Sequence, residues 1–145
     1  MTGPGPGQTL FGFVRHWSRR SAQAESVAEQ GRLVLVSEAV HSLAERGQPA
    51  TVNAVAYEIG IDQSGASRLV RNAESAGYLR LSPAAGDGRR REASLTAAGL
   101  SLLDQAHHWQ EEIFAQLTAG WSEQKRNDFQ QAMTELVKRS HTLGV

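Results

Sequence analysis

The side chains best suited to chemistry in this sequence are arginines gathered in one segment. Six arginines and two acidic residues lie between Ser64 and Arg91, and the segment contains no lysine. A guanidinium is planar and donates forked hydrogen bonds, which match both phosphate oxygens and the acceptor edge of guanine. The segment therefore predicts contact with nucleic acid, although the formal net charge of the whole chain is zero.

Short polar side chains accompany the arginines in the first half of this segment. Apolar residues recur every three or four positions from Ala66 to Ala73, which is the spacing of one buried helical face. The other positions carry hydroxyls, an amide and cations, the groups that read base edges and hold phosphates in a major groove. The candidate DNA-contacting residues of this predicted helix are Gln63, Ser64, Ser67, Arg68 and Arg71.

A turn rich in glycine and arginine follows, between two short alternating runs, 78–82 and 91–95, that predict a β-hairpin. Arg89 and Arg90 near its tip are placed to enter a neighbouring minor groove, whose negative potential attracts arginine. Asp87 precedes Arg89 by two residues, and we expect its carboxylate to hold that guanidinium in one direction. These three residues complete the candidate DNA-binding set.

Histidines precede glutamates by four residues at three places on predicted helices: His41 and Glu45, His107 and Glu111, His108 and Glu112. Such spacing can bring a nitrogen and a carboxylate oxygen to one metal ion, and it is also the spacing of an ordinary pair on a helix surface. The chain has no cysteine and no dense histidine cluster. We therefore assign no metal site and no cofactor, and a metal-sensing module stays an alternative.

Several classes of protein are disfavoured by the sequence. It contains no nucleophile elbow, phosphate-binding loop, dinucleotide-binding loop or zinc-protease helix, so no enzymatic activity is predicted. No apolar run approaches the roughly 20 residues of a membrane-spanning helix. The absence of cysteine suits a reducing compartment, so a cytoplasmic protein is expected. The length of 145 residues fits a single domain.

Glycines divide the chain into pieces of helical length. Gly31 separates two predicted helices, 9–30 and 32–46, and Gly60 separates two shorter ones. Two short helices joined by a brief turn with a glycine indicate a helix-turn-helix. Two more helices are predicted after the hairpin. The residues expected to cap helices are Thr51, Asp62, Thr96 and Ser122.

The motifs of the predicted wing resemble those of the MarR family of bacterial transcriptional regulators. The matching residues are Asp87-Gly88-Arg89, followed by Leu95-Thr96-Ala97-Ala98-Gly99. The stretch from Ile61 to Gly77 is similar to the recognition helix of that family. Ser82 and Ala93 depart from its pattern, since a basic residue and a larger aliphatic residue are usual there.

The resemblance implies a fold that is mainly α with a small β-hairpin wing: a winged helix-turn-helix with a helical dimerisation region. Residues 1–8 are expected to form a flexible tail before one MarR-like domain. Within that domain, 50–96 would bind DNA, whereas 9–46 and 97–145 would form the dimer. The implied partners are a second copy of the chain and double-stranded operator DNA of pseudo-palindromic sequence. The dimer would bind this DNA as a repressor.

The resemblance also implies a small-molecule effector that releases the DNA. Trp17, His41 and Trp109 are candidate effector-binding residues because they lie on helices that flank the predicted DNA-binding lobe. Packing in the core or the dimer interface is the alternative role for each. A winged helix that docks on another protein is the alternative for the whole chain, because fold does not fix function.

Overall fold

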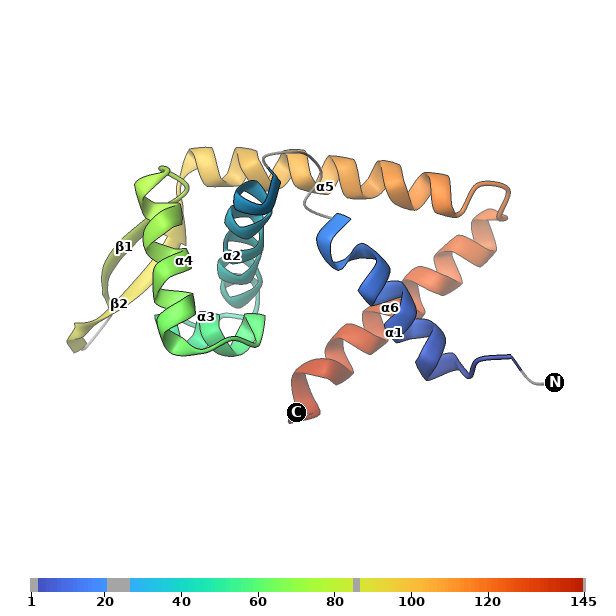
Figure 1. Cartoon of the computed structure of the whole chain (residues 1–145), viewed down its shortest axis with the longest axis horizontal. Coiled ribbons are helices and arrows are strands. Elements are labelled where there is room, and N and C mark those ends of the chain that lie inside the picture. Colours follow the sequence, from blue (N-terminus) through green and yellow to red (C-terminus); the bar gives the residue numbers. More distant parts are fainter. Residues whose placement is uncertain (1–2, 21–26, 85–86, 145) are drawn as a thin grey trace. The chain divides into compact units, whose positions relative to one another are not determined.

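The computed structural model describes residues 3–20, 27–84 and 87–144, and side chains at 3–18, 30–84 and 90–144. The chain forms two compact units, Met1–His107 and His108–Val145, called here the first and second units. The described residues form six helices and one antiparallel hairpin (Figure 1). In chain order the elements are α1 (Pro6–Arg20), α2 (Val27–Glu45), α3 (Val52–Ile59), α4 (Gln63–Ser75), β1 (Leu79–Ala84), β2 (Asp87–Leu95), α5 (Ala97–Leu117) and α6 (Glu123–Thr142). The predicted fold class is confirmed.

The two helices of the helix-turn-helix begin at the predicted capping residues. The Thr51 hydroxyl accepts a hydrogen bond from the backbone N–H of Ala54 at 3.1 Å and begins α3. Gly60 ends α3 with φ at +84°, a left-handed conformation that other residues adopt only at a cost. Asp62 then caps α4, accepting from the backbone N–H of Gly65 at 3.2 Å. These caps fix where the candidate recognition helix begins.

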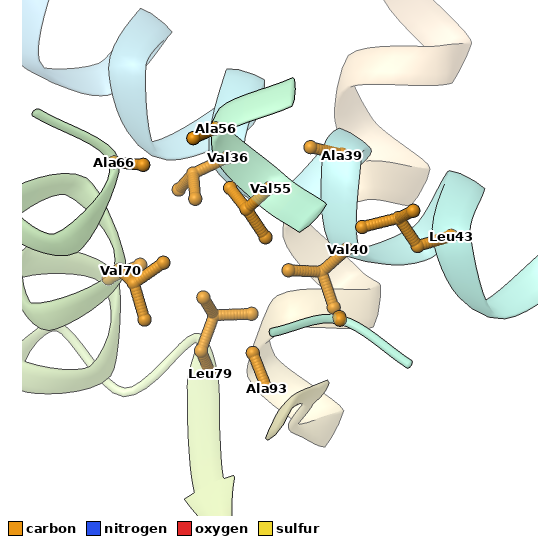
Figure 2. Close-up of a cluster of buried hydrophobic side chains, with 12 residues drawn as sticks. Val36, Ala39, Val40, Leu43, Val55, Ala56, Ala66, Val70, Leu79 and Ala93 are labelled. Carbon is orange, nitrogen blue, oxygen red and sulfur yellow. The ribbon is translucent and has the colours of Figure 1, made fainter. Parts of the chain in front are cut away.

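The core of the first unit forms where α2, α3, α4 and the hairpin meet (Figure 2). Val36 and Val40 enter it from α2, and Val55 enters it from α3. Val70 of α4 and Leu79 of β1 complete the cluster, and all five side chains are at most 2% exposed. Each such burial contributes about 1.5–3 kcal/mol, so the core holds α4 and the hairpin on α2.

The hairpin is longer than predicted. Pairing continues past the predicted strand ends to a last pair, Ala84 with Asp87, and the register shifts between Pro83 and Ala84. Proline has no N–H to donate, and such an irregularity is typical where a ladder loses a donor. The prediction of a turn at 86–88 is therefore wrong for Asp87 and Gly88, which lie in β2, whereas residue 86 lies outside the described residues.

The predicted helix boundary at Gly31 is also wrong. Gly31 lies inside α2, which begins at Val27, and α1 ends at Arg20. Glycine within a helix costs only about 1 kcal/mol, and the burial of Val36 and Val40 further along α2 outweighs that cost. The first helix also begins earlier than predicted, at Pro6, so only residues before it can belong to the proposed tail.

The second unit contains the end of α5 and all of α6. Ser122 caps α6 by accepting from the backbone N–H of Lys125 at 3.1 Å, as predicted. The Phe114 and Phe129 rings stack with centroids 6.3 Å apart, and Trp121 meets Phe129 edge-on at 5.6 Å. No residue of α6 is buried in this single chain. No helix among the described residues is long and apolar enough to cross a membrane.

Candidate nucleic-acid interface

The recognition helix α4 has one buried face and one exposed polar face. Ala66 and Ala73 are fully buried, which lets the helix approach the core closely. Ser64, Arg68 and Arg71 are exposed, and their spacing of four and three residues places them on one face. This face lies opposite the buried alanines, because each residue turns a helix by about 100°. It carries two cations and one hydroxyl.

The other two candidates on α4 lie beside this face. Ser67 is half-buried and stands one residue before Arg68, so it is rotated by about 100° toward the core. Gln63 is exposed in the first turn of the helix. The structure thus brings Ser64, Arg68 and Arg71 together and leaves Gln63 and Ser67 at the margin.

A local hydrogen-bond system orders the start of α4. The Ser64 hydroxyl donates to Oδ2 of Asp62 at 2.6 Å, and the same oxygen accepts from the N–H of Gly65. The Ser64 hydrogen bond, followed by backbone N–H groups and the positive charge of Arg68, lowers the pKa of Asp62 below its ordinary value of 3.8. Sequence reasoning gave Asp62 as a cap but missed the role of Ser64. The spacing Asp-x-Ser was the available signal.

The wing presents exposed arginines on β2. Arg91 pairs with Pro83 of β1, whereas Arg90 lies in the irregular stretch between the paired residues Asp87 and Arg91. Arg80 is exposed on β1 and was not among the predicted contacts. The side chains of Asp87 and Arg89 lie outside the described residues. The predicted contact between them therefore stays a prediction.

The residues that follow the wing fasten it to the end of α4. The Thr96 hydroxyl donates to the carbonyl oxygen of Gly77 at 2.6 Å, and the Thr96 N–H donates to that of Tyr78 at 3.1 Å. Gly99 lies so close to Tyr78 that an added Cβ would overlap the Tyr78 carbonyl oxygen. On the other side of the wing, the Ala93 N–H donates to the Ala50 carbonyl at 2.9 Å. Thr96 and Gly99 thus set the wing's position relative to α4.

An ion pair that sequence reasoning missed joins α2 to α3. Nη2 of Arg46 lies 2.5 Å from Oε1 of Glu58, and the two side chains are only 27% and 17% exposed. Arg46 also donates to the Ser42 hydroxyl at 2.5 Å. The partners are twelve residues apart and belong to different elements, so no helical spacing reveals the pair. It holds the helix-turn-helix against the end of α2.

The three candidate effector-binding residues are half-buried and lie in both units. Trp17 in α1 and His41 in α2 belong to the first unit, whereas Trp109 belongs to the second. The Trp17 ring meets that of His16 edge-on, with centroids 5.2 Å apart. Nε2 of His41 lies 3.5 Å from Oε1 of Glu45. Their assignment to an effector site stays a prediction.

The histidine–glutamate pairs behave as ion or hydrogen-bond pairs. His108 lies 3.1 Å from Glu112, as its spacing predicts. His107 contacts Glu38 of α2 at 2.5 Å, a partner from another helix that the spacing to Glu111 did not indicate. Within the described part of the chain, no group of three or more histidine, aspartate or glutamate side chains is arranged to hold a metal ion.

Comparisons with known proteins agree with this geometry. A sequence model of the MarR family matches residues 35–90, whereas no curated protein sequence matches the chain. A solved structure of MarR gives a TM-score of 0.72 at 19% identity, covering 99% of this chain and 96% of its own. A MepR mutant from a clinical isolate of S. aureus gives 0.70 at 18% identity, with 93% and 97% covered. The S. aureus MepR–DNA complex gives 0.60 at 19% identity, with 94% and 98% covered.

These matches confirm the resemblance drawn from the sequence. Residues 35–90, from α2 into the wing, match the MarR family model, and the chain as a whole has the fold of MarR and MepR.

Proposed function

We propose that this chain, a MarR-family winged helix within a MarR fold, is a sequence-specific regulator of transcription that binds double-stranded operator DNA. The observation that carries the proposal is the exposed face of α4. It combines Ser64 with the forked cations Arg68 and Arg71 on a helix held rigidly by its buried side. The exposed Arg90 and Arg91 on the wing add cations to the same unit. A protein with the same fold, S. aureus MepR, has been solved as a DNA complex.

The regulator would act as a homodimer on a pseudo-palindromic site, with 9–46 and 97–145 forming the dimer. Apolar side chains left uncovered in the single chain support this. Phe11 and Phe13 of α1 are 66% and 54% exposed, and Phe129 and Leu136 of α6 are 41% and 51% exposed. Large contiguous apolar surface is uncommon on monomers and is typical of protein–protein interfaces.

A small-molecule effector that releases the repressor from DNA completes the proposal. A protein of the same fold, the heme sensor PefR, has been solved with heme and carbon monoxide at 21% identity and a TM-score of 0.52. Trp17, His41 and Trp109 are the proposed effector-binding residues. In the cytoplasm, such a ligand would change the affinity for operator DNA by binding one conformation of the dimer better than another.

Binding to duplex DNA over a range of salt concentrations tests the central claim. The logarithm of the binding constant should fall linearly with the logarithm of salt concentration, because contacts with phosphates release counterions. Arg68→Ala and Arg71→Ala should differ in effect. The variant that loses a base contact should lose about 1–3 kcal/mol of operator-binding free energy and become less specific at one base position. The variant that loses a phosphate contact should weaken all sequences alike and lower the slope by about one.

Arg139→Ala provides the control for loss of one exposed arginine outside α4 and the wing, and because α6 belongs to the proposed dimer region, sedimentation must first show that its oligomeric state equals that of wild type. We expect its operator affinity to stay within about twofold of wild type. The proposal is wrong if both α4 variants bind a selected operator as tightly as wild type does. Binding that ignores salt for every duplex would favour a winged helix that docks on protein.

A further inference from the structure

At the start of α4, the side chains of Asp62 and Ser64 together can accept hydrogen bonds from a ligand but cannot donate one. The Ser64 hydroxyl has a single hydrogen, and that hydrogen is directed to Oδ2 of Asp62 at 2.6 Å. An ionised carboxylate can only accept, so this distance fixes Ser64 as the donor. The lowered pKa of Asp62 keeps the carboxylate ionised at neutral pH. What remains toward solvent is the lone pairs of the Ser64 hydroxyl and the oxygens of Asp62, all of which are acceptors.

Ser64 lies on the face proposed to enter the major groove, and its hydrogen bond holds the carboxylate of Asp62, the cap, next to it. Ser64 precedes Arg68 by four residues, which is a rise of about 6 Å along the helix. That distance corresponds to about two base pairs at 3.4 Å each. Both Asp62 and Ser64 are exposed, so the carboxylate sits beside the groove edge that Arg68 would read.

Resting on the proposed function, we infer that Asp62 and Ser64 together determine specificity by reading an exocyclic amino group, within about two base pairs of the base read by Arg68. In the major groove only cytosine N4 and adenine N6 donate hydrogen bonds. The other polar atoms that DNA presents there are acceptors: guanine O6 and N7, thymine O4 and the phosphate oxygens. An acceptor cannot form a hydrogen bond with the Ser64 oxygen or the Asp62 carboxylate, and the Asp62 charge would repel it.

Cytosine fits the pair better than adenine does. Adenine carries the N7 acceptor beside its amino group, and this acceptor would be brought toward the Asp62 carboxylate. Cytosine presents only its amino group and a C–H at that edge, and carboxylates accept from cytosine N4 in known contacts. Arginine favours guanine, so with Arg68 as the base-reading arginine the expected half-site places a cytosine on the contacted strand close to a guanine.

Selection from a pool of random duplexes with the protein of residues 1–145 tests this inference. Wild-type protein should enrich a half-site with cytosine, or secondly adenine, at one position near a guanine. Ser64→Ala leaves the Asp62 cap and its bond to Gly65 in place, so the protein should fold. Its preference at that single position should fall by about threefold to tenfold, the equivalent of one hydrogen bond. Ser101→Ala is the matched control, an exposed serine near the start of α5, and should select the wild-type site.

Asp62→Asn removes the negative charge but keeps the helix cap, because asparagine caps helices about as well as aspartate. Loss of the negative charge should raise affinity for an arbitrary 30-base-pair duplex by about threefold at low salt, while the preference at the same position falls. The salt slope of Ser64→Ala should equal that of wild type, because no phosphate contact is lost.

The outcomes are distinguishable. If wild type enriches a site but Ser64→Ala selects an identical one, or weakens every sequence alike, the amino-group assignment is overturned and the proposed function stands. The assignment is also overturned if the base preference that disappears in Ser64→Ala is a preference for guanine or thymine. If wild type enriches no sequence, both the inference and the proposed function fail.

Discussion

Replacement of Gly99 by alanine should destabilise the protein although it lies in a helix. At an unhindered helical position, Gly→Ala stabilises by about 0.5–1 kcal/mol. At position 99 the added Cβ would overlap the Tyr78 carbonyl oxygen and lie 3.0 Å from Cδ2 of Leu95. A carbonyl oxygen of the backbone cannot rotate away as the end of a side chain can. The start of the wing must therefore move relative to α5.

The magnitude follows from two costs and one gain. Overpacking costs about 1–3 kcal/mol. Movement of Tyr78 also weakens the 3.1 Å hydrogen bond that its carbonyl accepts from Thr96, worth about 1 kcal/mol. After subtraction of the gain in helix propensity, Gly99→Ala should lower the free energy of unfolding by about 1–3 kcal/mol. A displaced wing should also weaken operator binding at temperatures where the variant is fully folded.

Urea unfolding followed by circular dichroism measures the change, at one fixed protein concentration because the stability of the proposed dimer would depend on concentration. Gly12→Ala is the control, since the nearest atom to its added Cβ within the chain is Nη2 of Arg15 at an ordinary 3.7 Å, and because α1 belongs to the proposed dimer region, sedimentation is used to check that this variant assembles as wild type does. That variant should be as stable as wild type or more stable. A Gly99→Ala protein as stable as Gly12→Ala would refute the argument that Gly99 is required by close approach to Tyr78.

Three further predictions concern charge and assembly. Ser64→Ala should raise the pKa of Asp62 toward 3.8, because the Ser64 hydrogen bond is the largest cause of its lowering, and the carboxyl carbon signal in an NMR pH titration reports this. Since that pKa is lowered on folding, the cap's contribution to stability is present above pH 3.8 and is lost as the pH falls through the lower folded value. Asp87→Ala should weaken operator binding at moderately high salt if the carboxylate holds Arg89, and tighter binding there would show that it does not. Sedimentation at micromolar concentration should show a dimer, and a folded, stable monomer would rule out the two-half-site arrangement.

Local signals in the sequence predicted the helices and strands that carry the candidate interface. A cap and the helix after it are decided by neighbouring residues, so Thr51, Asp62 and Ser122 begin helices where expected. The alternation of the hairpin strands and the buried face of α4 are likewise local periodicities. The error at Gly31 arose because a glycine was given more weight than the apolar residues on both sides of it.

The contacts that hold the interface in place were not predictable in this way. Arg46 and Glu58 are twelve residues apart, and His107 and Glu38 are separated by 69. Such pairs form only when the core has brought their helices together. The close approach at Gly99 has the same origin: the sequence shows a glycine, and only the packed structure shows what lies against it.

The formal net charge of zero bears on how such a protein would select its site. Long-range attraction to a polyanion follows net charge, and at physiological salt it is screened within about 8 Å. Affinity must then come from short-range contacts of exposed cations on α4 and the wing, including Arg68, Arg71 and Arg91. The Asp62 carboxylate opposes contact with phosphates at the start of α4. Weak binding to arbitrary DNA lowers the background against which an operator competes, so selectivity can be high even where the operator contacts are few.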